Sequence, residues 1–195
     1  MKNTIKLFGI IAFIAVMGFG MAACDGDNNR GSTPPSLNGT WANTEGEGTK
    51  LVLNNGSITV SFGTGAQTIE AMKGAYVVTS GTSMTVTFTQ VNGDQLSSWL
   101  EEVLQALEQS GQTGASMLQV TLNATQLYTE VQFKAAIVTA VVAQWSLQEA
   151  AASGMVDNMF TPDFHSPFST ETIPYNLSGN TLTVTMGDPI VFTRQ

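Results

Sequence analysis

Few residues in this sequence have side chains that could do chemistry. His165, in the segment PDFHSPF, is the single histidine, and Cys24 is the single cysteine. Asp163 and Ser166 lie too close to His165 for a triad whose members come from separate elements, and no nucleophile elbow is present. One histidine and one cysteine also supply too few ligands for a zinc site. We therefore expect no enzyme, no catalytic residue, no metal and no cofactor, and a polar or capping role for His165 in a loop.

Cys24 has a different chemistry, because the residues before it form the pattern of a bacterial lipoprotein signal. The basic segment MKNTIK precedes an apolar run of 14 residues, LFGIIAFIAVMGFG, and then MAAC. Such a run suits a signal peptide and is short for a membrane-spanning helix. The pattern predicts that residues 1–23 are removed and that the thiol of Cys24 takes the diacylglycerol. An ordinary cleaved signal and an uncleaved anchor are the alternatives, and both also leave the domain outside the cytoplasm.

The expected partners follow from this anchor and from the charge. Without the two lysines of the leader, the mature chain keeps five basic residues against 15 acidic ones, a net charge of −10. Five scattered basic residues form no phosphate-binding patch, so we expect no nucleic-acid partner. Anionic membrane surfaces repel such a domain, so attachment depends on the acyl chains. We expect an extracytoplasmic, lipid-anchored protein of the cell envelope, with outer and inner membrane both left open.

A flexible tether is predicted between the anchor and the folded domain. Residues 25–36, DGDNNRGSTPPS, hold no large apolar side chain and cannot bury enough surface to offset the entropy of ordering. We assign residues 24–36 to the lipidated cysteine and the tether. Residues 37–195 form one domain, whose length suits a single sizeable core.

Apolar residues alternate with threonine and serine near both ends of this domain. In LVLNNGSITVSF, two alternating runs flank Asn55-Gly56, a strong hairpin signal because both residues tolerate positive φ. The segments YVVTSGTSMTVT and YNLSGNTLTVT share a tyrosine, Ser-Gly and Thr-Val-Thr in the same order, which predicts two similar hairpins of one sheet. The alternation indicates antiparallel strands with one buried face.

Between about residues 94 and 165 the pattern becomes helical. Leucines recur at helical spacing in DQLSSWLEEVLQALEQSG, and EVQFKAAIVTAVVAQWSLQEAAASG predicts a second helix that ends at Gly154. NMFTPDFHSPFSTETIP is expected to be a connection, broken by prolines, back to the sheet. The predicted fold class is mainly β: a small antiparallel up-and-down barrel of about eight strands, with a helical insertion between the N-terminal and C-terminal strands. An open meander covered on one side by the insert is the alternative.

Several segments together resemble a known family. LNGTW, GAYVVTSGTSMTVTFTQVNG, NMF and YNLSGNTLTVT…FTR are similar to segments of small bacterial lipocalin-like lipoproteins, over about residues 37–93 and 155–195. The resemblance implies a lipocalin-like barrel, in which a tryptophan on the first strand closes one end and an arginine on the last strand packs across it. The matching positions are Gly39, Trp41 and Arg194. Because an indole face attracts a guanidinium by roughly 0.5 to 2 kcal/mol, we expect Trp41 and Arg194 to be in contact.

Function then depends on the interior of the barrel. Apolar side chains on one face of the strands either fill a core or line a pocket for one small apolar ligand. Nine of them form the candidate pocket: Leu53, Val60, Phe62, Met84, Val86, Phe88, Leu182, Val184 and Met186. The insert is a candidate lid over the open end, through Trp99, Leu100, Leu104, Phe133 and Trp145.

Two functions are consistent with these residues. The first is a lipid-anchored module that binds a small hydrophobic ligand. The second is a structural or interaction lipoprotein with a filled barrel, which contacts a protein partner through the insert or the threonine-rich outer face.

Overall fold

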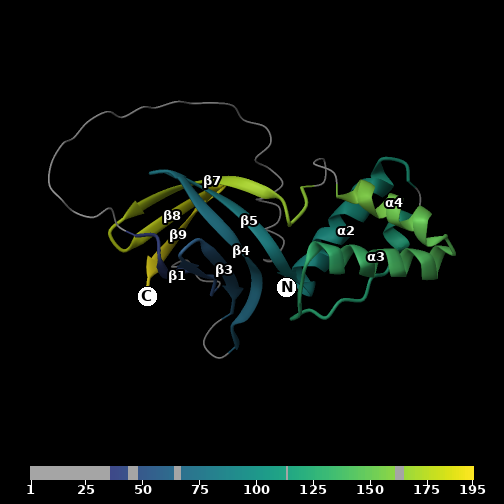
Figure 1. Ribbon diagram of the computed structural model, residues 1–195, viewed down its shortest axis with the longest axis horizontal. Helices are drawn as coiled ribbons and strands as arrows, with labels where there is room; N and C mark the ends of the chain where they lie inside the picture. The colour runs from purple at the N-terminus through teal and green to yellow at the C-terminus, as the bar shows by residue number, and fades with distance from the viewer. Residues whose placement is uncertain (1–35, 44–47, 64–66, 113, 161–164) are drawn as a thin grey trace.

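The computed structural model of the protein describes residues 36–43, 48–63, 67–112, 114–160 and 165–195. The predicted signal peptide, Cys24 and the tether up to residue 35 lie outside the described residues. Figure 1 shows a β-barrel with a group of helices on one side of it. None of the helices in the described ranges is long and apolar enough to cross a membrane.

Eight strands close into an antiparallel barrel. They are β1 (Gly39–Asn43), β2 (Lys50–Asn54), β3 (Ser57–Phe62), β4 (Ile69–Ser80), β5 (Ser83–Asn92), β7 (Thr170–Ser178), β8 (Thr181–Met186) and β9 (Asp188–Arg194). Each strand pairs with the next along the chain, β5 pairs with β7, and β9 returns to β1. The predicted up-and-down barrel with a helical insertion is therefore confirmed, and the alternative of an open meander is wrong. Closure leaves the barrel strands without an exposed edge.

The hairpins form at the predicted turn residues. Asn55 and Gly56 have φ angles of 47° and 86° between β2 and β3, which a two-residue hairpin turn requires. The two similar hairpins are β4–β5 and β7–β8, in which a buried tyrosine, Tyr76 or Tyr175, pairs with a valine of the next strand. The supposed connection before Tyr175 is partly strand, because β7 already begins at Thr170. Pro174, the last proline of that segment, lies within this strand.

The barrel has two different ends. The turns β2–β3, β4–β5 and β7–β8 lie at one end, together with the start of β1 and the last residues of β9. We call this the closed end. At the opposite end, β5 runs into the insert, β7 leaves it, and Gly187 links β8 to β9. We call this the open end. The insert is attached at the open end because β5 ends there and β7 begins there.

In its described residues the insert forms three α-helices, the short 3-10 helix η2 (Ala115–Met117) and one short strand. The α-helices are α2 (Gly93–Gln109), α3 (Glu130–Trp145) and α4 (Glu149–Met159), and β6 (Leu127–Tyr128) pairs with the end of β5. The prediction of one helix ending at Gly154 is wrong. α3 ends where Ser146 adopts a left-handed φ of 54°. α4 then runs through Gly154, where an added Cβ would meet nothing within 4 Å, so this glycine terminates no helix.

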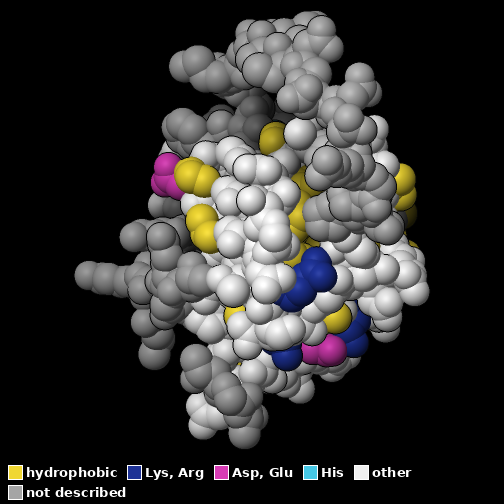
Figure 2. Space-filling view, turned by 90° about the vertical axis from the view of Figure 1, so that its left-hand side faces the viewer, with side chains coloured by type: hydrophobic (Ala, Val, Ile, Leu, Met, Phe, Trp, Pro, Cys, Tyr) yellow, Lys and Arg dark blue, Asp and Glu magenta, His cyan; other side chains and the backbone are white. Residues whose placement is uncertain are grey.

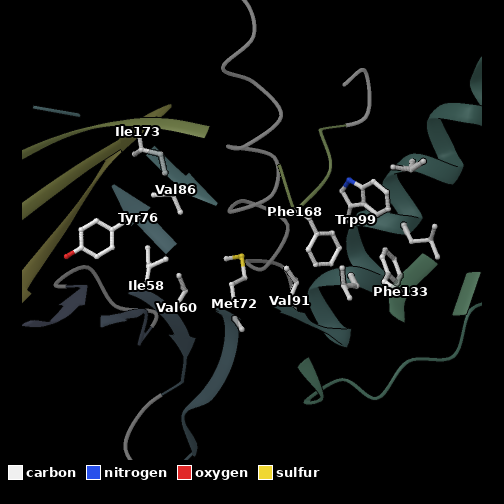
Figure 3. Packing of buried hydrophobic residues seen from close by; sticks show 14 of the residues in the cluster. Ile58, Val60, Met72, Tyr76, Val86, Val91, Trp99, Phe133, Phe168 and Ile173 are labelled. Carbon is white, nitrogen blue, oxygen red and sulfur yellow. The ribbon is translucent and has the colours of Figure 1, made fainter. Parts of the chain in front are cut away.

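One apolar cluster joins the barrel and the insert. Figure 3 shows the barrel residues Tyr76 and Val86 at one side, Trp99 and Phe133 of the helices at the other, and Phe168 between them. The rings of Trp99 and Phe133 are 5.8 Å apart in an edge-to-face arrangement. The expected lid residues therefore pack within the helical insert itself. Among the described residues, no helix residue belongs to the lining of the pocket at this opening; the return segment, residues 165–169, contributes Ser166, Pro167 and Ser169 instead.

Candidate functional site

The closed end holds the residues expected to seal the barrel. Trp41 is completely buried, and its Nε1 donates a hydrogen bond to the carbonyl of Leu37 at 2.9 Å. Arg194 is its direct partner across β1 and β9, and the guanidinium carbon lies 4.5 Å from the indole centroid. The guanidinium also donates to the carbonyl of Ser36. The structure thus brings Trp41 and Arg194 together, and the contact binds the first strand to the last.

Gly39 allows this arrangement by its backbone conformation. Its φ is 150°, which L side chains rarely adopt. A Cβ at this position would lie 3.7 Å from both Arg194 Nε and Trp41 Nε1, so the space itself would accept a methyl group. The requirement for glycine here is therefore conformational. All three positions of the closed end lie close together, and Trp41 among them is completely buried.

The nine candidate pocket residues separate into two groups. Leu53, Val60, Met84, Leu182 and Val184 are at most 5% exposed and fill the barrel as core. Phe62 packs against this core and is partly buried. The remaining three, Val86, Phe88 and Met186, line a pocket. Towards the closed end these side chains fill the interior, and the pocket that the described residues line lies towards the open end.

This space, the open-end pocket, is the candidate binding site. Strands β4, β5, β7 and β8 and the return segment supply its lining: Met72, Val86, Phe88, Ser166, Pro167, Ser169, Glu171, Ile173 and Met186. Its empty volume is about 380 Å³ when the open solvent is included. The enclosed part is smaller, since the centre of a water molecule can occupy about 20 Å³ of it, room for one or two waters. A ligand of more than a few atoms must extend from this enclosed part into the open rim.

Glu171 is the charged residue of this otherwise mostly apolar wall. It pairs directly with Val86 across β7 and β5, and Val86 is 1% exposed. Directly paired residues of antiparallel strands project to the same face, so Glu171 points to the barrel interior. Burial raises the pKa of Glu171, and the charge of His165 and a hydrogen bond from the Ser169 side chain oppose that shift only in part. A half-buried carboxyl with a perturbed pKa in a cleft is a typical functional-site signal.

His165 does not belong to the lining of this pocket, although it influences Glu171 electrostatically. It starts the return segment with a left-handed φ of 44° and is half-buried. Its charge reaches Glu171, but Asp163, the acidic residue considered beside it in a triad, lies outside the described residues. In the part of the chain that the structure describes, no three His, Cys, Asp or Glu side chains are grouped to hold a metal ion.

Sequence reasoning missed Glu171 and Ser169, and it considered Ser166 only as a possible partner of His165. The segment NMFTPDFHSPFSTETIP, which carries them, contains three prolines and was expected to be a connection, which hides the alternation at its end. Read as a strand, TETIPYNLS places Glu171, Ile173 and Tyr175 on one face. An acidic residue in the inward register of an apolar strand is the signal that would have identified it.

Comparison with known proteins adds little to this description. No family model matches the chain, and no curated protein matches it. One match among solved structures is an uncharacterized protein from Bacteroides eggerthii DSM 20697, which is 8% identical. The alignment covers 82% of this chain and all of that one, with a TM-score of 0.36. At that level the match carries no argument about fold or function.

Proposed function

We propose that this protein is a lipid-anchored lipoprotein of the cell envelope whose lipocalin-like barrel binds a small, largely apolar ligand in the open-end pocket. The observation that carries the proposal is the position of the space: buried side chains fill the barrel towards the closed end, and the pocket lies towards the open end. The pocket combines apolar walls with a few polar groups, as small-molecule sites do. This binding module is not an enzyme in our proposal.

The position of the chain's N-terminal side supports the same arrangement. Ser36, the first described residue, is held at the closed end by the guanidinium of Arg194. A tether that leads from Cys24 to this point would attach the barrel by the end opposite the pocket. The twelve residues of such a tether have a root-mean-square length of about 20 Å when flexible, so the pocket would stay accessible from solvent.

Ligand binding is tested with the methionine methyl groups as reporters. In protein labelled with ¹³C at these methyls, titration with octan-1-ol should shift the signals of Met72 and Met186, which line the pocket. Met117, which is 70% exposed on the insert, is the internal control and should not shift. Shifts at Met117 equal to those at the pocket would indicate unspecific adsorption and would contradict the proposal, as would no shift at any methionine.

The lipid anchor is tested by its processing. Inhibition of lipoprotein signal peptidase should leave an unprocessed precursor, and Cys24→Ser should abolish labelling with radioactive palmitate. Normal processing under the inhibitor would contradict the anchor and leave the pocket proposal intact.

A barrel core without space for a ligand would favour the second function, a structural or interaction lipoprotein with a protein partner. Figure 2, which views the molecule from the side opposite the helices, shows separate apolar side chains on the part of this face that the described residues form. Protein-docking surfaces usually present a larger continuous apolar patch. Native mass spectrometry of the protein from its source membrane separates the two functions, since a bound small molecule supports the first and a bound protein without small molecule supports the second.

A further inference from the structure

We propose that the open-end pocket selects an amphiphile with a protonated amine as its head group, and that Glu171 is the counter-ion. This inference rests on the proposed binding function and specifies the ligand class of the same site. The apolar part of the ligand would lie against Met72, Phe88 and Met186. The amine would lie at the carboxylate.

The position of Glu171 makes it the residue that a ligand head group would meet. It lies on the same strand face as Ile173, whose side chain also lines the pocket. The other polar side chains of the lining are the hydroxyls of Ser166 and Ser169, and the remaining lining residues are apolar. A cation that entered this pocket would therefore find one carboxylate and two hydroxyl groups as its polar contacts.

The described part of the chain offers Glu171 no lysine or arginine. Lys73 pairs with Glu70, and Lys134 pairs with residues of α3 and α4. Arg194 is occupied at the closed end, on Trp41. Lys50 is exposed on β2, a strand that contributes nothing to the pocket.

The groups around Glu171 therefore offset the burial of its charge only weakly. His165 and Ser169 only partly offset the cost of burying the Glu171 charge, since the pKa of the carboxyl stays raised. Even a half-buried carboxylate loses part of its hydration, which a weak partner does not replace. An ammonium group in the pocket would reduce that cost by a charge-assisted hydrogen bond.

The same charge opposes anionic amphiphiles. A fatty acid of similar size would place its carboxylate beside Glu171, and like charges at close distance repel each other. The net charge of −10 of the mature chain adds to this repulsion at long range. The pocket should therefore rank ligands of one chain length in the order amine, alcohol, carboxylate.

Three probes of equal chain length test this order: octylamine, octan-1-ol and octanoate. At pH 7.5 the purified protein should bind octylamine about tenfold more tightly than octan-1-ol, the gain of one hydrogen bond to a charged group. Octanoate should bind more weakly than the alcohol. Glu171→Gln should reduce the affinity for octylamine to about the affinity for octan-1-ol. Glu149→Gln, which removes an exposed carboxylate from α4, is the matched control and should keep the preference.

The outcomes separate this inference from the proposed function. Binding of octan-1-ol without an amine preference, or a preference that survives Glu171→Gln, overturns the inference and leaves the binding function in place. No binding of any probe overturns both. A preference lost equally in Glu149→Gln would show attraction by overall charge and would also overturn the inference. Should Glu171→Gln not fold, as judged by its circular dichroism, the order of the three probes on the unaltered protein decides.

Discussion

Trp41 and Arg194 are direct neighbours across β1 and β9, with the guanidinium carbon 4.5 Å from the indole centroid. The contact joins the first strand of the barrel to the last, so it closes the sheet by side chains as well as by backbone hydrogen bonds. It also reaches beyond the barrel, because Leu37 and Ser36 accept hydrogen bonds from these two side chains. The same two residues therefore connect the first strand to the last and hold Ser36 and Leu37, the first two described residues, against the barrel.

Arg194→Ala should lower the free energy of unfolding by about 1 to 3 kcal/mol. The change removes the cation–π contact, worth up to about 2 kcal/mol when desolvated, and a charged hydrogen bond to a backbone carbonyl. Urea unfolding followed by tryptophan fluorescence measures it. Lys50→Ala, at an exposed position on β2, is the control and should change stability by less than about 0.5 kcal/mol. Equal effects of the two changes would show that the pair contributes nothing to closure.

Phe133→Ala should lower the free energy of unfolding by about 3 to 5 kcal/mol, as expected for the loss of a large aromatic core residue. Phe133 is completely buried, and its ring contacts both Trp99 and Phe160. Val131→Ala on the same helix is the matched control, since Val131 is 78% exposed, and should cost less than about 0.5 kcal/mol. Thermal and urea unfolding measure both variants. A small effect of Phe133→Ala would mean that the insert is not part of the cooperative core.

The barrel could be predicted because its determinants are local. Period-two alternation and turn residues such as Asn55-Gly56 specify antiparallel hairpins without reference to the rest of the chain. The insert was predicted less well, since its second helical segment is apolar on most faces and gives no clear helical period. The break at Ser146 comes from a left-handed residue that the sequence does not announce, because serine rarely adopts that conformation.

The candidate site was predicted only in part. Val86, Phe88 and Met186 were expected to face a pocket, but their alternation cannot say which inward residues fill a core and which border a space. That distinction depends on how far the return segment reaches into the opening. Glu171 was missed because the nearby Pro174 favoured a connection over a strand. Proline is uncommon in sheets, since it cannot donate a hydrogen bond to the neighbouring strand.

Asn38→Ala should lower the free energy of unfolding by about 1 kcal/mol, because it removes hydrogen bonds that are largely exposed. The Asn38 side chain accepts from the backbone N–H of Asn55 at 2.9 Å and from the hydroxyl of Tyr76 at 2.9 Å. It thereby ties the segment before β1 to the closed end. Tyr76→Phe should show about half of the loss, and Asn176→Ala, at an exposed position of β7, should show almost none. Urea unfolding distinguishes the three variants, and a loss for Asn176→Ala as large as for Asn38→Ala would contradict this role.

Glu171→Gln should stabilise the protein at neutral pH by comparison with the unaltered chain. Burial raises the pKa of Glu171 in the folded state above its value in the unfolded state. Between these two pKa values the folded protein binds more protons, so its free energy of unfolding falls as the pH rises. Glutamine carries no charge and avoids this loss. Glu102, whose pKa burial also raises, is present in both proteins and cancels in the difference.

The stability difference between Glu171→Gln and the unaltered protein should therefore be smallest near pH 4, grow as the pH rises through the interval between the two pKa values, and then stay constant. Melting temperatures measured from pH 4 to 8 at constant ionic strength give this curve. Glu149→Gln should differ from the unaltered protein by less than about 0.5 kcal/mol throughout. A difference for Glu171→Gln that does not change with pH would mean that the carboxylate is not strained by burial. The pocket would then lack the unfavourable charge on which selection of an amine depends.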